Sequence, residues 1–345
     1  MGRVVSLTRS LSVTLFEHFG PTPGVYDDPE LMLVRQRLLT LDPEGKRFAR
    51  ILRDTIDQLL DGEHTGRFDW NDLHKTEKTH AGTLVEINLL REFEFDSGAD
   101  MDYLIEGIEV DCKFSQKLYG WMIPPEALDE ICLVIWADDH QGLWSAGLLR
   151  ANRAKLTTSG TVTKKGNRDG KFRLTKEHHA LVSWLWPKAP LEENLLLHID
   201  KATQTAILAA GSGSKRSPGQ ARVNELFRRV QKRRVSRTVI RTLAQQKDYM
   251  KRVRYNGGAR EKLRDEGILI CGDYPNHQAV AEQLGIPVPL EGENVSVRVV
   301  EAKPHHVGLP SVILEGRRWV EAGPDDLPEQ APLLPETNKK ASTSD

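Results

Sequence analysis

Asp102-Tyr-Leu-Ile-Glu-Gly-Ile-Glu-Val-Asp-Cys-Lys113 is the stretch around which the chain is best interpreted. Two isoleucines flank a Glu-Gly pair, and glycine at the second loop position supplies the positive φ that a tight hairpin turn requires. We therefore predict a β-hairpin in which Ile105 pairs with Ile108. The same register places Asp102 opposite Asp111, whereas a three-residue loop would place it opposite Cys112.

The predicted hairpin has two chemically different faces, because the pleat of a strand sends alternate side chains to opposite sides. The apolar face holds Tyr103, Ile105, Ile108, Val110, Cys112 and Phe114. The polar face holds Asp102, Leu104, Glu109, Asp111 and Lys113. Cross-strand Cβ atoms are roughly 5 Å apart, and like charges at that distance destabilise a sheet. A divalent cation with oxygen ligands, beside a lysine, would relieve the repulsion.

Length and composition exclude several classes of protein. The chain has 345 residues, which favours about two domains, and its hydrophobic fraction of 39% supports well-packed cores. Its three cysteines are far apart, which argues against a disulfide framework or a zinc knuckle. No apolar run is long enough to span a membrane, and the N-terminus lacks the apolar region of a secretion signal. We therefore expect a cytoplasmic protein with no membrane partner.

Hydrophobic periodicity predicts two helices upstream of the hairpin. Asp42-Pro43 is a typical helix start, and apolar residues then recur at helical spacing. A second helix over residues 79–94 carries Glu86 on its apolar side. Downstream of the hairpin, the apolar runs 131–137 and 143–149 predict two neighbouring strands, the first of them covered on both faces. Together these elements predict an α/β domain with a mixed sheet flanked by helices.

The C-terminal half contains a strongly basic segment. Residues 215–264 carry 17 lysines and arginines against three acids, a net charge of +14 within a chain whose total is −1. Helical periodicity followed by strand-like runs predicts a winged helix-turn-helix. A charge run can also be a solvated helix face, but this concentration of positive charge favours binding to a phosphate backbone. The residues that we expect to contact DNA are Arg233, Arg234, Arg237, Arg241, Lys251, Arg252 and Arg254.

The acids around the hairpin point to a nuclease. Asp-x-Lys is a weak signal by itself, but here an acid on a helix and an acid on the neighbouring strand precede it. This order resembles the PD-(D/E)xK nuclease signature, with Met101 in place of the usual proline. One or two Mg²⁺ ions held by Asp102, Asp111 and Glu86 would polarise a phosphate and lower the pKa of bound water. Lys113 would position or deprotonate that water, or stabilise the charged phosphate.

Other candidate motifs carry less chemistry. His178-His179 and His305-His306 lack a third metal ligand at a familiar spacing, so we expect surface histidines. No strand leads into Gly211-Ser-Gly213, as a phosphate-binding loop would require, and we predict a linker there. Trp184 and Trp186 are predicted to be packing residues beside a domain boundary.

Five runs of sequence carry a more specific signal. They are Thr83–Glu86, Met101-Asp102, Ile108–Lys113, Gly120–Pro125 and Gly219–Phe227. In these runs the chain resembles the NaeI family of type II restriction endonucleases, and the resemblance covers roughly residues 30–325. It implies that the catalytic residues are Glu86, Asp102, Asp111 and Lys113.

The same resemblance implies a cofactor and partners. These are Mg²⁺, a homodimer, and double-stranded DNA with a GC-rich palindrome such as GCCGGC. It also implies a C-terminal winged-helix domain, of the catabolite-activator-protein type, that binds a second copy of DNA as an allosteric effector.

We therefore predict a restriction-endonuclease-like domain at residues 1–180, a linker at 181–190, a winged-helix DNA-binding domain at 191–325 and a disordered tail at 326–345. The predicted function is site-specific hydrolysis of double-stranded DNA by a type II restriction endonuclease. Two alternatives remain open: a DNA-binding regulator whose acidic hairpin is structural, and a repair nuclease that nicks one strand. Incubation with plasmid and Mg²⁺ separates the three hypotheses. A restriction endonuclease produces linear fragments, a regulator leaves the plasmid uncut, and the repair nuclease produces nicked circles.

Overall fold

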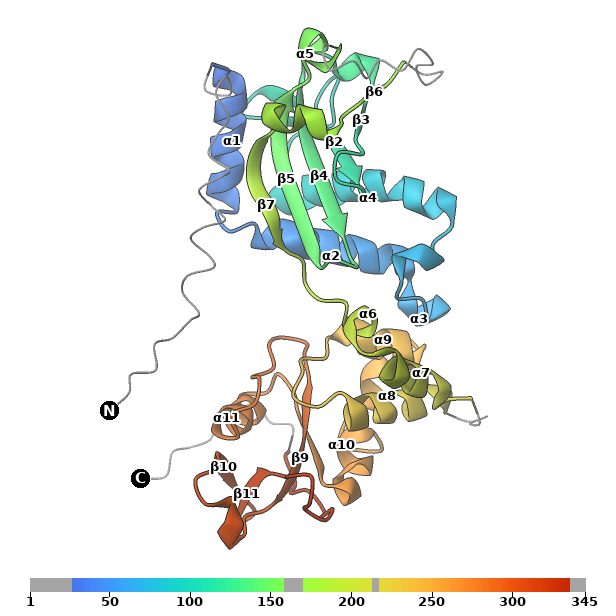
Figure 1. The fold of residues 1–345 in the computed structure, drawn as a ribbon, viewed down its shortest axis with the longest axis vertical. Coiled ribbons are helices and arrows are strands. Elements are labelled where there is room, and N and C mark those ends of the chain that lie inside the picture. Colours follow the sequence, from blue (N-terminus) through green and yellow to red (C-terminus); the bar gives the residue numbers. More distant parts are fainter. Residues whose placement is uncertain (1–26, 158–169, 213–216, 336–345) are drawn as a thin grey trace, which may run out of the picture. The chain divides into compact units, whose positions relative to one another are not determined.

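The computed structural model describes residues 27–157, 170–212 and 217–335 (Figure 1). The chain divides into two compact units. Unit 1 contains residues 1–59 and 73–193, and unit 2 contains residues 60–72 and 194–345. No helix among the described residues is long and apolar enough to cross a membrane.

Unit 1 is built on a five-stranded mixed sheet. Its strands are β1 (Tyr103–Ile105), β2 (Ile108–Ser115), β4 (Ile131–Asp138), β5 (Leu143–Arg150) and β7 (Ser183–Pro190), in the order β1-β2-β4-β5-β7. Strands β2 and β4 are parallel, and the other neighbours are antiparallel. A separate two-stranded sheet pairs β3 (Met122–Ile123) with β6 (Phe172–Arg173). The predicted mixed sheet is thus confirmed.

Helices cover one face of this sheet. Unit 1 contains α1 (Pro29–Leu41), α2 (Lys46–Leu60, whose last residue belongs to unit 2), α4 (Lys75–Phe93) and α5 (Arg153–Thr157). Figure 1 shows α2 and α4 running across the same face. Phe48 of α2 packs there against Phe93 of α4, Trp144 of β5 and Trp186 of β7, with ring centroids between 4.7 and 6.1 Å apart. A second core on the opposite face includes Trp121, Cys132, Val134 and Trp136, so β4 is covered on both faces as predicted.

Two expectations for unit 1 are wrong. Residues 181–190 are not a linker, because β7 forms the last strand of the sheet. Its prolines suggested a linker, but an edge strand tolerates residues that lack an N–H donor. The helix predicted from Asp42 begins instead at Lys46. Asp42 ends α1, and its side chain accepts a hydrogen bond from the Phe48 N–H at 3.0 Å.

Unit 2 combines a cluster of helices with an antiparallel sheet. Its helices are α3 (Gly62–Thr65), α6 (Leu195–His198), α7 (Lys201–Ala209), α8 (Pro218–Arg229), α9 (Arg237–Ala244), α10 (Ala259–Lys262) and α11 (Pro275–Gln283). Its strands are β8 (Ile268–Cys271), β9 (Val295–Glu301), β10 (Ser311–Leu314) and β11 (Arg317–Glu321), in the order β10-β11-β9-β8. Short 3₁₀ turns occur in both units at Trp70–Asp72, Pro125–Ala127, Lys176–Leu181, Tyr249–Arg252, Arg264–Glu266 and Pro304–His306.

Alternating residues of β8 join two cores. Ile268 and Ile270 pack with helices α6 to α10, whereas Leu269 and Cys271 pack with α11 and the rest of the sheet. The second core also contains Ala331. The tail expected to be disordered from residue 326 is therefore ordered as far as residue 335, and residues 336–345 lie outside the described part of the chain.

Candidate active site

The hairpin has the predicted register. Ile105 pairs with Ile108 and Tyr103 pairs with Val110, which confirms a two-residue loop. Glu106 and Gly107 in that loop have φ angles of 52° and 78°. Positive φ at both central positions is typical of the type I′ turn, whose twist matches that of the flanking strands. Asp102 directly precedes β1, and continuing the register by one residue places it opposite Asp111 of β2.

Lys113 lies between two carboxylates. Its Nζ is 2.5 Å from Asp111 Oδ1 and 3.8 Å from Asp102 Oδ2, and it donates a further hydrogen bond of 3.1 Å to the Cys112 carbonyl. Asp111 is only 5% exposed, and none of the described groups hydrogen-bonds to its buried Oδ2. Burial raises the pKa of Asp111, an effect that Lys113 opposes. The structure therefore brings three of the four predicted catalytic residues together.

Asp102 is held by the backbone around it. Its Oδ2 accepts a hydrogen bond of 2.6 Å from the Cys112 N–H. The loop before it is fixed by Glu109, whose two carboxylate oxygens accept hydrogen bonds from the N–H groups of Ala99 (2.7 Å) and Met101 (2.9 Å). Those backbone hydrogen bonds lower the pKa of Glu109. Sequence reasoning assigned no role to Glu109, and its place on the polar face of the hairpin was the available signal.

Glu86 reaches the same region from α4. The Tyr103 hydroxyl donates a hydrogen bond of 2.9 Å to the Glu86 carbonyl, which ties the helix to the start of β1. Burial raises the pKa of the Glu86 carboxyl, and the charges of Asp102 and Asp111 raise it further, whereas Lys113 lowers it. The ligand atoms of Glu86, Asp102 and Asp111 do not all lie within 4.8 Å of one another, although the three carboxyls are close enough to interact electrostatically.

Comparison with known proteins identifies the family of the chain. The family model described as restriction endonuclease NaeI matches residues 32–329. The chain belongs to this family. The type II restriction enzyme NaeI of Lentzea aerocolonigenes is 52% identical to it over 309 residues, which cover 89% of this chain and 95% of the relative. Membership of the NaeI family makes the chain a site-specific DNA nuclease and confirms the resemblance seen in the sequence.

A second group of possible metal ligands lies in unit 2 of this NaeI-family chain. It contains His305, His306 and Asp326. The Lys303 N–H donates a hydrogen bond to His306 Nδ1 at 3.0 Å, so Nδ1 is the unprotonated nitrogen of the neutral ring. The ring proton is then on Nε2, which donates to Asp326 Oδ2 at 3.1 Å. A nitrogen that carries a proton has no lone pair for a metal, and we interpret this group as a structural contact.

Two of the four histidines expected at the surface are buried. His306 is 7% exposed and His178 is 3% exposed. Each accepts a backbone hydrogen bond at the start of a 3₁₀ turn, from Lys303 and Thr175 respectively. A buried polar ring needs such partners, and no sequence pattern predicted these short turns.

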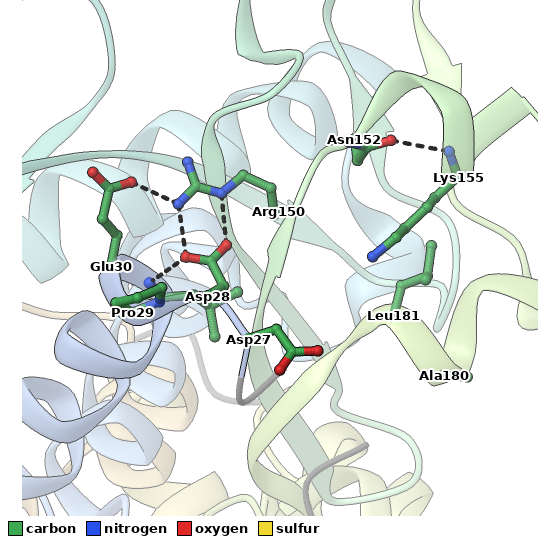
Figure 2. A pocket seen from close by; sticks show the side chains of 10 residues that line it. Asp27, Asp28, Pro29, Glu30, Arg150, Asn152, Lys155, Ala180 and Leu181 are labelled. Carbon is green, nitrogen blue, oxygen red and sulfur yellow. Dashed lines mark hydrogen bonds and ion pairs between the residues drawn. The ribbon is translucent and has the colours of Figure 1, made fainter. Parts of the chain in front are cut away.

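A pocket of about 600 Å³ lies at the start of α1 (Figure 2). Its wall carries a charge cluster in which Arg150 pairs with Asp28 at 2.8 Å and with Glu30 at 2.7 Å. The Arg150 hydrogen bond lowers the pKa of Asp28. The Asp27 carboxylate points away from Arg150. None of the four predicted catalytic residues lines this pocket, and its ion pairs hold α1 against the end of β5.

The basic residues predicted to contact DNA lie around α9 and the turn that follows it. Several have acidic neighbours at the surface: Arg234 is 3.5 Å from Glu293, Arg237 is 3.3 Å from Asp273, and Lys251 is 2.9 Å from Asp248. Arg241 stacks over Tyr249, Arg252 donates to Gln246, and Arg233 and Arg254 lie in the same region. Exposed pairs of this kind contribute little to stability and can exchange partners for phosphate. One other member of the basic segment, Arg260, is buried and binds the Ile270 carbonyl and Asn294.

Proposed function

We propose that this chain is a Mg²⁺-dependent type II restriction endonuclease that cleaves double-stranded DNA at a GC-rich palindrome resembling GCCGGC. It acts as a homodimer, so that each protomer cuts one strand of the symmetric site. Unit 1 supplies the nuclease site, and unit 2 binds a second copy of DNA as an allosteric effector. The observation that carries the proposal is the placement of Lys113 between Asp102 and Asp111 in a NaeI-family chain.

The side chains of the site fit a divalent cation. Asp111 Oδ2 is buried and lacks a hydrogen-bond partner among the described groups, which is the state expected of an oxygen that ligates a metal. Asp102, Asp111 and Glu86 would hold Mg²⁺, whose preferred ligands are such hard oxygens. When bound, the ion supplies Lewis-acid polarisation of the phosphate and a lowered pKa for its bound water.

The residues themselves perform the rest of the chemistry. A lysine ammonium has three N–H groups; two of those on Lys113 donate to Asp111 and to the Cys112 carbonyl, which leaves one for a phosphate oxygen or the attacking water. Burial alone would lower the pKa of Lys113, but Asp111 outweighs that effect and raises it. We therefore assign Lys113 to orientation and charge stabilisation. Glu109 is a positioning residue, since it acts on Asp102 through the loop at residues 99–101.

Substitution of the central pair tests this assignment. We expect Asp111→Asn and Lys113→Ala to slow Mg²⁺-dependent cleavage of plasmid DNA by about 10²- to 10⁴-fold, while DNA binding measured with Ca²⁺ stays near that of the wild-type protein. Glu106→Gln is the matched control, because Glu106 is an acid of the same hairpin that lies in its turn. Retained cleavage by either variant would defeat the assignment, and a wild-type protein that binds DNA without cutting it would indicate a regulator.

The proposal that unit 2 is a winged helix rests on its order of elements. Helix α8 is followed by a bridge between Val235 and Asn294, then by α9 and α10, and then by β8 and β9. This is the order of a winged helix-turn-helix with α11 between its last two strands. The basic residues around α9 supply the charge that binding to phosphates requires.

The salt dependence of DNA binding tests the second site. Replacing Arg233, Arg234 and Arg237 with glutamine should reduce the slope of log affinity against log salt by up to about one unit per lost phosphate contact. Arg229→Gln is the control, because Arg229 ends α8 and lies outside α9 and the turn that follows it. An unchanged slope in the triple variant would show that these arginines form a solvated face.

A further inference from the structure

The glycine inside α4 has no packing reason within the described chain. Three glycines fall within helices there: Gly62, Gly82 and Gly219. A Cβ at Gly62 would lie 2.1 Å from Thr242 Oγ1, and one at Gly219 would lie 2.2 Å from the Ala244 carbonyl oxygen. A Cβ at Gly82 would meet no described atom within 4 Å. Glycine weakens a helix interior relative to alanine, so the space beside Gly82 calls for another explanation.

The position of Gly82 relates that space to the acids of the nuclease site. Gly82 precedes Glu86 by four residues and follows Lys75 by seven, so the three lie on one side of α4. The buried stripe of the helix, Ala81, Val85, Leu89 and Phe93, lies beside them. The open space therefore borders the side of α4 from which Glu86 reaches Asp102 and Asp111.

We propose that Gly82 leaves room for the sugar–phosphate backbone of the substrate DNA. This inference rests on the proposed nuclease function and adds a substrate-contacting surface to it. Glycine is the residue used where a second backbone must approach closely. A strand of DNA held one turn from Glu86 places its phosphates beside the acids, and the exposed ammonium of Lys75 lies on the same side to attract them. A second protein chain packed there would instead cover Glu86 and exclude the substrate.

Two substitutions of different size test the proposal. Gly82→Ala and Gly82→Leu both favour the helix, so each variant of the full chain should unfold at an unchanged or higher temperature. Each should also cleave plasmid DNA more slowly in single turnover at saturating enzyme, by about tenfold or more for leucine and by less for alanine. Thr83→Leu is the matched control: Thr83 is the next residue of α4 and is exposed, but points about 100° away around the helix.

The outcomes distinguish this inference from the proposed function. If the wild-type protein cuts DNA and Gly82→Leu cuts it at the same rate, the inference fails and the nuclease assignment stands. If the wild-type protein does not cut DNA with Mg²⁺, the proposed function fails. A loss of the dimer in Gly82→Leu, measured by sedimentation, would assign the space to a second copy of the chain and overturn contact with DNA.

Discussion

The loop that positions Asp102 can be displaced by a single methyl group at Gly98. A Cβ there would lie 2.2 Å from Glu109 Oε2 and 2.3 Å from the Met101 carbonyl oxygen, whereas real Cβ contacts are essentially never shorter than 3.0 Å. The Glu109 carboxylate can rotate away, but it then releases the N–H groups of Ala99 and Met101. The Met101 carbonyl has to move by at least the difference between 3.0 and 2.3 Å, which is 0.7 Å.

That shift lies one residue from Asp102. A misplacement of about 1 Å in an enzyme active site can cost about 10²-fold in rate, so we expect Gly98→Ala to cleave plasmid DNA roughly 10- to 100-fold more slowly in single turnover with Mg²⁺. Gly142→Ala is the control for backbone strain alone: Gly142 lies in the β4–β5 turn with a φ of 61°, so alanine is strained there, but its Cβ meets no described atom and does not displace the 98–101 loop. Wild-type cleavage by Gly98→Ala would refute the reasoning that the 98–101 loop positions Asp102.

Three further predictions concern stability. Asp28→Asn keeps the helix cap of α1 but removes the charge beside Arg150, which lowers the pKa of Asp28 from 3.8. In urea unfolding, the wild-type protein should therefore have a free energy of unfolding about 1 kcal/mol higher than the variant near pH 6, and this difference should vanish as the pH falls below 3.8. Arg53→Ala removes the cation from the buried Asp139, which lies 2.5 Å away, and should cost about 3–5 kcal/mol, measured by tryptophan fluorescence; adding Asp139→Ala should restore part of the loss. Mg²⁺ at 100 times its Kd should stabilise the wild-type protein by about 2.7 kcal/mol, and a thermal shift as large in Asp111→Asn would contradict our assignment of the ligands.

The parts of the site that were predictable from the sequence are those fixed by local geometry. A two-residue turn determines which residues face each other, so Glu106-Gly107 was enough to place Asp102 and Asp111 on one side of the hairpin. The helical period predicted that Glu86 shares the buried stripe of α4, and the structure places it half-buried beside that stripe. The burial of β4 on both faces was predictable from its continuous apolar run.

Interactions that depend on distant or irregular segments were not predictable. The role of Glu109 requires the loop at 99–101 to fold back over β2, and no periodicity describes that loop. Strand β7 was missed because its prolines are acceptable only at the edge of a sheet, and the edge is set by the order of the strands. The burial of Arg260 depends in the same way on its contact with Asn294 in a distant part of the sequence.

The charge balance of the site argues against a purely structural hairpin. Among the described residues, Glu86, Asp102 and Asp111 face one cation, Lys113. Burial raises the pKa of both Glu86 and Asp111, because their charged forms lose contact with water. Buried ionic clusters are seldom the most stable solution, and apolar replacements of similar volume often stabilise a protein. A second lysine would neutralise only one of the two excess negative charges, and it would offer no position at which water or a phosphate oxygen could coordinate. One divalent ion held by these acids would neutralise both and would leave positions for water and a phosphate oxygen, so the excess of acids supports the cation-dependent site that we propose.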